Sequence, residues 1–353
     1  MIPVRLTRAE LEERPGTEEV AAELEGLVLV RDVGEGRERR IRKGTLLDGE
    51  DARRLLELPW EELHLLRPED GDVPEAEAGD RLARAAAGEG TDARAFTAGH
   101  WPLHALSRGV LEVRVKALDG VNAHDELAVF THPDGRVVDA GETVARAKVI
   151  PFLIPDAVLR QAGERAGEAG GLVAVRPFRA TRVTALVQES LGEGALERFR
   201  EALGKKLAWF GSELDGPHLV PPRADAVAEA LTGALEAEPG LLLLAGAKSM
   251  NPLDPAFQAL ERLGATILRH GVPAHPGTLL WLARRGDVPI VGVPSCGLFS
   301  RATVFDLVLA RILADLPVDA ESLGRMGHGG YLTPEMAWRF PPYREGGPRG
   351  EIE

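Results

Sequence analysis

Strand-like and helix-like segments alternate along the chain from residue 172 to about residue 318. Such alternation is typical of a parallel sheet covered by helices, because each parallel strand is joined to the next by a crossover helix. The pattern therefore predicts an α/β domain with a mainly parallel sheet. Strands are expected at 183–191, 207–211, 241–247, 265–272 and 278–293, the last range holding two strands about an Arg-Gly-Asp turn. Helices are expected at 192–206, 223–237, 255–264 and 300–314.

Two smaller, β-rich α+β modules are expected before this domain, at 1–67 and 68–160. In the first, Asp48 can cap a helix, and a strand follows at 58–68. A helix at 156–171 runs into glycines and suggests the boundary to the α/β domain at 172–320. The remaining residues, 321–353, are expected to form a C-terminal tail.

The second module contains mostly strand-like patterns. Its acidic start at 68–80 is rich in proline and glycine, which indicates a linker, and a helix is expected at 80–90. Alternating apolar and polar residues predict a strand at 109–118. A Pro-Asp-Gly turn between two β-type runs predicts a hairpin at 126–141. A further strand is expected at 143–155.

Composition narrows the classes of function. The formal net charge is −13, and nucleic-acid binding needs clustered Lys and Arg, so we expect no nucleic-acid partner. No apolar run approaches the roughly 18 residues of a membrane span, so no membrane association is expected. The first residues lack the apolar core of a signal peptide. Cys296 is the single cysteine. These features predict a cytoplasmic protein.

The leucine-rich strand at 241–247 ends in a loop of small residues. Gly246 and Ala247 allow a ligand to approach the backbone, while Lys248 supplies a positive charge and Ser249 a hydroxyl group. In an open parallel sheet, ligands bind beyond the carboxyl ends of the strands, and a helix start favours an anion. The loop therefore suits a phosphate. A tight turn with a solvated lysine and with Asp254 as a plain helix N-cap fits the same residues.

Two further loops are expected at the same end of the sheet. In the second loop His275 can donate to an anion, while Pro276 and Gly277 shape the backbone. The third loop joins a strand to the last helix, whose N-cap is expected at Ser300. Its candidate residues are Pro294, Ser295 and Cys296. Solvent exposure of the histidine and burial of an inert cysteine remain open alternatives.

Together these loops resemble the molybdopterin-binding domain that is shared by molybdopterin adenylyltransferases and molybdopterin molybdotransferases. The family's Gly-Gly-x-Ser-x-Gly-Asp-x-Asp loop matches residues 246–254. Its Lys-Pro-Gly-Lys element matches 275–278, and its Gly-x-Pro-Gly-Asn-Pro turn matches 292–297. The resemblance implies a three-layer α/β/α domain that binds molybdopterin. It implies a catalytic role for Asp254 and no metal ligand. The implied cofactor-binding residues are Gly246, Ala247, Lys248, Ser249, His275, Pro276, Gly277, Pro294, Ser295 and Cys296.

The N-terminal half resembles a narrower group, bacterial molybdopterin-binding proteins that sometimes carry a fused nucleotidyltransferase domain. The matching stretches are 42–57, 109–131 and 142–155. We expect no fused domain in this chain. One departure concerns chemistry, because Pro252 stands where the family has the first acid of its first loop. Proline cannot bind Mg²⁺, which prefers carboxylate and water oxygens.

Three functions follow from the resemblance. The first is a protein that binds molybdopterin for cofactor biosynthesis, transfer or storage, with molybdoenzymes or other cofactor-biosynthesis proteins as partners and self-association into homo-oligomers. The second is an active adenylyltransferase or molybdotransferase that uses Mg²⁺ with ATP or molybdate. In that case Asp119, Asp125 and Glu126 could replace the missing acid. The third is a related hydrolase such as a nucleotide-sugar pyrophosphatase, since a fold alone does not fix a function.

Overall fold

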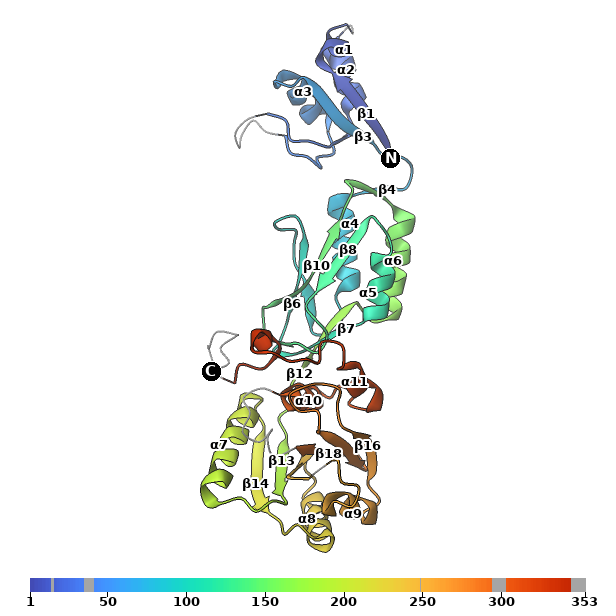
Figure 1. Ribbon diagram of the computed structural model, residues 1–353. Coiled ribbons are helices and arrows are strands. Elements are labelled where there is room, and N and C mark those ends of the chain that lie inside the picture. Colours follow the sequence, from blue (N-terminus) through green and yellow to red (C-terminus); the bar gives the residue numbers. More distant parts are fainter. Residues whose placement is uncertain (14–15, 35–40, 248, 294–302, 344–353) are drawn as a thin grey trace. The chain divides into compact units, whose positions relative to one another are not determined.

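The computed structural model describes residues 1–13, 16–34, 41–247, 249–293 and 303–343 (Figure 1). Clustering of contacts divides the chain into two compact units. The first unit comprises Met1–Ser107, Leu111–Asp134 and Asp139–Val175. The second comprises Arg108–Val110, Gly135–Val138 and the chain from Arg176 onward.

The first unit begins with a small α+β module. Its sheet has the strand order β1-β3-β2, and its core is made of leucine, valine, alanine and isoleucine side chains. Asp48 caps α3 by accepting hydrogen bonds from the backbone N–H groups of Glu50 and Asp51, which confirms the predicted N-cap. The elements are β1 (Ile2–Thr7), α1 (Arg8–Glu12), α2 (Thr17–Leu24), β2 (Val28–Leu29), α3 (Gly49–Glu57) and β3 (Glu62–Arg67).

A second module follows, with a four-stranded antiparallel sheet in the order β5-β6-β10-β8. Its elements are β4 (Asp72–Pro74), α4 (Glu75–Ala86), β5 (Thr91–Ala93), β6 (Trp101–Ala105), α5 (Val115–Asn122), β8 (Leu127–Thr131), β10 (Thr143–Val149), β11 (Leu153–Pro155) and α6 (Asp156–Glu168), with the larger parts of β7 (Gly109–Val113) and β12 (Val173–Pro177). The short strand β9 (Val137–Val138) belongs to the second unit. The helix predicted at 156–171 is confirmed by α6.

The linker predicted at 68–80 is wrong, because this stretch holds β4 and the first turns of α4. The buried face of α4 consists mainly of small residues, so the sequence shows no pattern of bulky apolar side chains there. Ala78 is fully buried, and a Cβ on Gly79 would lie 2.2 Å from the ring of Trp101. The helix therefore packs closely on the sheet through small residues.

Two further predictions for this module are corrected. The strand expected at 109–118 ends at Val113, and α5 begins two residues later. The hairpin expected at 126–141 does not form among the described residues, because β8 pairs with β10 while β9 pairs with β7. Its turn is present, with Gly135 at a φ of 80°. The turn therefore redirects the chain to another sheet instead of returning it along β8.

The second unit is the predicted α/β domain. Its six-stranded sheet has the order β14-β13-β15-β18-β17-β16. The first four strands are parallel, and β17 and β16 are antiparallel to their neighbours. The elements are β13 (Arg182–Val187), α7 (Glu193–Trp209), β14 (Glu213–Leu219), α8 (Ala224–Glu236), β15 (Leu241–Ala245), α9 (Pro255–Arg262), β16 (Thr266–His270), β17 (Trp281–Arg285), β18 (Val288–Val293), α10 (Val304–Leu313), α11 (Ala320–Arg325) and the 3₁₀ helix η2 (Pro334–Arg339).

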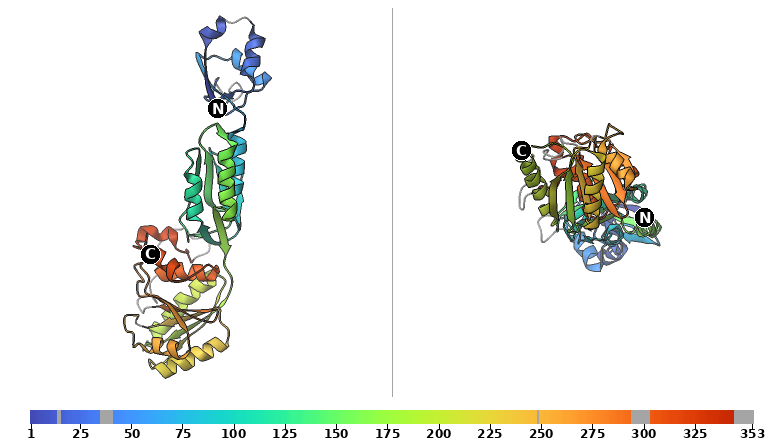
Figure 2. Two further views of the ribbon diagram at one scale, coloured as in Figure 1. Left: turned by 90° about the vertical axis from the view of Figure 1, so that its right-hand side faces the viewer. Right: turned by 90° about the horizontal axis from the view of Figure 1, so that it is seen from below.

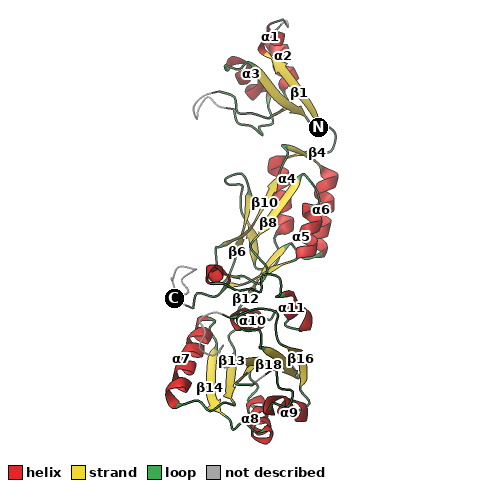
Figure 3. Cartoon of the chain, viewed as in Figure 1, coloured by secondary structure: helices red, strands yellow, loops and turns green. Residues whose placement is uncertain are grey.

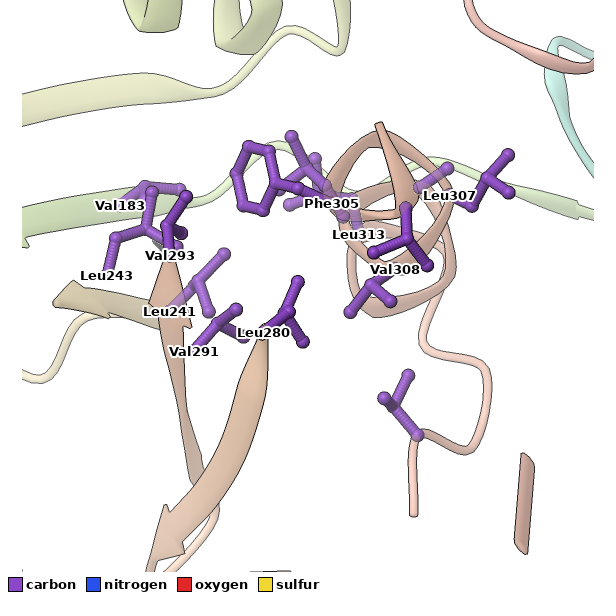
Figure 4. Close-up of a cluster of buried hydrophobic side chains, with 14 of the residues drawn as sticks. Val183, Leu241, Leu243, Leu280, Val291, Val293, Phe305, Leu307, Val308 and Leu313 are labelled. Carbon is purple, nitrogen blue, oxygen red and sulfur yellow. The ribbon is translucent and has the colours of Figure 1, made fainter. Parts of the chain in front are cut away.

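This sheet lies between two layers of helices, so the three-layer α/β/α prediction is confirmed. Figures 2 and 3 show α10 and α8 on opposite sides of the sheet. The leucines of β15 alternate between the layers because successive side chains point to opposite faces of a strand. Leu241 and Leu243 pack with α7 and α10, whereas Leu242 and Leu244 pack with α8 and α9. Figure 4 shows the first of these layers, where Phe305 and Val308 of α10 lie beside the strands.

One strand of this unit was predicted in the wrong place. The segment 207–211 does not form a strand, because α7 continues to Trp209. Phe199, Leu203 and Leu207 are buried four residues apart, which is the helical spacing. The edge strand is instead β14, which contains a Gly-Pro pair and only two leucines. Proline is tolerated there because an edge strand needs ladder hydrogen bonds on one side only.

Candidate functional site

Strand pairing brings three loops to one edge of the sheet in the second unit. Ala245, the last residue of β15, lies opposite Val293, the last residue of β18. Trp281, the first residue of antiparallel β17, lies opposite Gly292 and also opposite His270 at the end of β16. Strands β15 and β18 therefore end at the same end of the sheet. The loop between β16 and β17 lies at this end as well. We call the loop after β15 the first loop (246–254), the loop after β18 the third loop (294–302) and the loop between β16 and β17 the second loop (271–280).

The first loop starts with a tight backbone turn at Gly246. This residue has a φ of 84°, a conformation that glycine adopts without strain. A Cβ placed here would lie 2.9 Å from Cβ of Glu189, the second residue after β13. Only glycine therefore allows the first loop to pass this close to the end of the neighbouring strand.

The first loop ends at a buried polar pair. The side-chain Nε2 of Gln188 donates a hydrogen bond of 2.6 Å to Oδ1 of Asp254. The same oxygen accepts a 3.0 Å bond from the backbone N–H of Ala256, so the predicted N-cap role of Asp254 is confirmed. Because this carboxylate already occupies the start of α9, the helix terminus offers little to an external anion. A phosphate at the first loop would depend on other donors.

Two buried oxygen atoms lie beside the first loop without a hydrogen-bond partner in the described part of the chain. They are Oε1 of Gln188 and Oε2 of Glu189. Buried polar atoms are almost always hydrogen-bonded, so an unpaired acceptor at a loop cluster needs an explanation. Both atoms are acceptors, and a ligand that satisfies them must present N–H or O–H donors.

Sequence reasoning missed Gln188 and Glu189 as site residues. A signal was present, since both follow a buried strand of a parallel sheet, at the edge where ligands bind. They lie more than fifty residues before the first loop in the sequence, and their proximity comes from the pairing of β13 with β15. The family motif that guided the prediction does not include them.

The predicted residues of the first loop have different surroundings. Ala247 is 3% exposed and packs with the α8 and α9 layer, so its methyl group belongs to the core. Ser249 is half-buried. Met250 and Leu253 are 78% and 73% exposed, which is unusual for large apolar side chains. The predicted residues Lys248, Pro294, Ser295 and Cys296 lie outside the described residues, and so does the expected N-cap Ser300.

The second loop is held mainly through its backbone. The N–H of His275 donates to the carbonyl of Gly330, and the carbonyl of Pro276 accepts from the N–H of Val304. A Cβ on Gly277 would lie 2.5 Å from Cγ1 of Val304, so this glycine permits the loop to touch the start of α10. The side chain of His275 is exposed to solvent.

Thr303 is the N-cap of α10, where the third loop ends. Thr303 and Asp306 form a capping box, in which the side chain of each residue accepts a hydrogen bond from the backbone N–H of the other. Asp306 is fully buried, and its Oδ1 forms an ion pair of 2.6 Å with Nζ of Lys206. The start of α10 is thus fixed to α7.

The carboxylates proposed as replacements for the missing acid belong to the first unit. Asp119 lies in α5, and Asp125 and Glu126 follow that helix. Within the second unit, Glu189 is the carboxylate that lies beside Gly246. Across the described ranges, no three His, Cys, Asp or Glu side chains are grouped to hold a metal ion. None of the described helices has the length and apolar character needed to cross a membrane.

Comparison with models of protein families and with curated proteins yields no match. Solved structures similar to this chain include a molybdopterin biosynthesis MoeA protein from Pyrococcus horikoshii, which is 12% identical over 69% of this chain and 79% of its own, with a TM-score of 0.31. A MogA structure is 18% identical over 38% of this chain and 92% of its own, with a TM-score of 0.27. A molybdenum cofactor biosynthesis protein from Pyrococcus furiosus is 20% identical over 57% of this chain and 70% of its own, with a TM-score of 0.26. Because these TM-scores are low, we base the proposed function on the residues of the site.

Proposed function

We propose that this protein binds molybdopterin and acts in the biosynthesis, transfer or storage of the molybdenum cofactor. The order and spacing of the three loops support the proposal, as does the pairing that places the last residues of β15 and β18 and the first residue of β17 at one end of the sheet in the second unit. In this role molybdopterin is a substrate or cargo of the site.

Two acceptors that have no hydrogen-bond partner among the described residues, Oε1 of Gln188 and Oε2 of Glu189, carry the proposal. A pterin ring presents an amino group and a ring N–H on one edge. A carboxylate and an amide oxygen can accept hydrogen bonds from these two donors. In a site removed from water, such matched polar contacts fix the orientation of a ligand and distinguish it from a ring without those donors. The Oε1 of Gln188 and the Oε2 of Glu189 are buried, and the Oε2 of Glu189 lies 3.5 Å from the position that a Cβ of Gly246 would take. We place the donor edge of the pterin at these two oxygens.

The phosphate of molybdopterin needs donors of its own. Asp254 occupies the start of α9, so the helix terminus is not the phosphate site in this proposal. We assign the phosphate to Lys248 and Ser249, which supply a cation and a hydroxyl group in the first loop. His275 of the second loop is assigned to the same anionic group. The net charge of −13 makes a local cation essential for holding a phosphate.

An active molybdotransferase or adenylyltransferase is the second candidate, and one observation favours it. The carboxylate of Glu189 lies 3.5 Å from the position that a Cβ of Gly246 would take. It is therefore near the loop in which Pro252 replaces the family acid. A carboxylate in this place could support Mg²⁺ chemistry without the missing acid, because Mg²⁺ is bound by one or two carboxylates together with substrate phosphates.

Incubation of the purified protein with molybdopterin, Mg-ATP and molybdate separates these candidates. Binding without turnover supports the binding protein, whereas adenylylated pterin or inserted molybdenum supports the enzyme. The variants Lys248→Ala and Ser249→Ala are expected to weaken binding, and Glu236→Gln on the exposed face of α8 is the matched control. If the wild-type protein does not bind molybdopterin, both candidates are wrong.

A further inference from the structure

The C-terminal segment 327–343, called the strap from here on, pairs with the second loop. His275 N–H donates to the carbonyl of Gly330, and Leu332 N–H donates to the carbonyl of His275, both at 2.8 Å. This parallel bridge is centred on His275 and Tyr331. A Cβ on Gly330 would lie 2.5 Å from the carbonyl oxygens of Pro273 and Met326. The strap therefore meets the loop backbone to backbone, at a distance that only glycine permits.

The far end of the strap is attached to α10. The hydroxyl of Tyr343 donates to Oδ1 of Asp306 at 2.5 Å, the oxygen that also pairs with Lys206. The tyrosine ring packs edge-on against Trp209, the last residue of α7, and Phe210, the residue after it, with centroid distances of 6.0 and 6.1 Å. This contact joins the strap to two helices through one buried carboxylate.

Asp306 transmits this attachment to the residue where the third loop ends. Its other oxygen, Oδ2, accepts a 2.7 Å hydrogen bond from the backbone N–H of Thr303, the N-cap of α10. A carboxylate held by Lys206 and Tyr343 has little freedom to rotate. The position of the Thr303 backbone is therefore coupled to the strap.

The middle of the strap is built into the fold of the second unit. Leu332 and Phe340 are 9% and 7% exposed and belong to its hydrophobic core. Arg339 donates a 2.5 Å hydrogen bond from its guanidinium to the carbonyl of Gly329, and burial lowers its pKa. The guanidinium of Arg136 lies over the ring of Trp338. A segment with these contacts can hold the loops that it touches.

We propose that the strap positions the second loop and the start of α10, with Gly330 and Tyr343 as its positioning residues. Gly330 sets the second loop, and Tyr343 sets the start of α10 through Asp306. The ligand affinity of the site then depends on residues that do not contact the ligand. This last consequence rests on the proposed function, whereas the ordering of the loops does not.

Two full-length variants test the strap. Gly330→Ala forces the strap away from the carbonyl of Pro273, while Tyr343→Phe keeps the ring and removes the donor to Asp306. Matched controls are Gly233→Ala in α8, where an added Cβ meets no atom within 4 Å, and Tyr331→Phe, whose side chain is 76% exposed. Backbone amide exchange of the ligand-free proteins is measured for residues 272–280, 303–308 and 241–245. Molybdopterin affinity is measured in parallel.

Gly330→Ala is expected to raise amide exchange at 272–280 about tenfold, and Tyr343→Phe to raise it at 303–308 by a similar factor. Exchange in β15 should match the controls, and molybdopterin should bind roughly tenfold more weakly to Gly330→Ala. Exchange equal to that of the controls would overturn the proposal, and so would faster exchange with unchanged affinity. If Gly330→Ala does not fold, Tyr343→Phe decides alone. If the wild-type protein does not bind molybdopterin, the proposed function is wrong. The amide exchange rates of the ligand-free proteins then still test whether the strap positions the backbone at 272–280 and 303–308.

Discussion

The amide Nε2 of Gln188 lies 2.6 Å from Oδ1 of Asp254, although the two residues are 66 positions apart in the sequence. Both side chains are buried, at 4% and 5% exposure. The bond connects the residue after β13 to the residue before α9. Together with the close approach of Gly246 to Glu189, it fixes both ends of the first loop against the neighbouring strand. The Oε1 of Gln188 is thereby held beside that loop.

Replacement of Asp254 by alanine is expected to destabilise the second unit. It removes the cap of α9 and leaves the buried amide of Gln188 without its acceptor. Each loss costs about 1–2 kcal/mol, so the free energy of unfolding should fall by about 2–4 kcal/mol. Urea unfolding measures this change. Glu236→Ala, on an exposed position of α8, should stay within about 0.5 kcal/mol of wild type.

A double-mutant cycle isolates the contact itself. If the amide and the carboxylate stabilise each other, Gln188→Ala should cost less in the Asp254→Ala background than in the wild-type protein. An equal loss of unfolding free energy in both backgrounds would mean that the two side chains do not interact. The contact would then not hold the first loop in place.

Gly292 is expected to tolerate no side chain. A Cβ at this position of β18 would lie 1.8 Å from Cε2 of Trp281, whose ring is fully buried. Gly292→Ala should therefore lower the free energy of unfolding by at least about 1–3 kcal/mol, the usual cost of overpacking. Gly233→Ala should instead be neutral or stabilising by up to about 1 kcal/mol, because alanine is the better helix former. Similar stability of the two variants would contradict the packing of Trp281 on β18.

Tyr343 is expected to make the second unit sensitive to alkaline pH. Burial, reinforced by the nearby charge and hydrogen bond of Asp306, raises the pKa of Tyr343 well above its ordinary value. Because the pKa is higher in the folded state, the folded state retains the proton more strongly. The resulting stability is fully present below the ordinary tyrosine pKa of about 10 and declines as the pH rises above it.

Ultraviolet titration tests this expectation in a Tyr331→Phe background, where Tyr343 is the remaining tyrosine. Tyrosinate absorbance should appear together with the loss of circular dichroism, because ionisation requires unfolding. In Tyr343→Phe the alkaline loss of stability should be smaller. Reversible ionisation near pH 10 in a protein that keeps its fold would show that the hydroxyl is not buried against Asp306.

Local patterns predicted the elements with strong periodicity. The leucine run of β15, the Asp-Pro start of α9 and the apolar helix α10 are all present close to the expected residues. The mainly parallel sheet also followed from the alternation of strands and helices, whereas the three-layer arrangement was implied by the family resemblance. Sequence pattern succeeded here because each of these elements buries a regular face against the sheet.

Long-range pairing set the features that were missed. The edge strand β14 lacks a regular alternation of apolar and polar residues. Strand β8 pairs with β10 instead of forming the predicted hairpin. The buried face of α4 is made mainly of small residues and is identified by its contact with Trp101. The same limit applies to the site, because Gln188 and Glu189 reach the first loop through the pairing of two strands that are distant in sequence.

Molybdopterin affinity of Glu189→Gln tests the central claim most directly. The substitution keeps the shape of the side chain but replaces the charged acceptor by an amide. Loss of a charge-assisted hydrogen bond should raise Kd about tenfold to a hundredfold, while Glu236→Gln should leave it within about twofold. An unchanged Kd for Glu189→Gln, in a protein that binds molybdopterin, would contradict the assignment of the pterin edge to the buried acceptors beside Gly246.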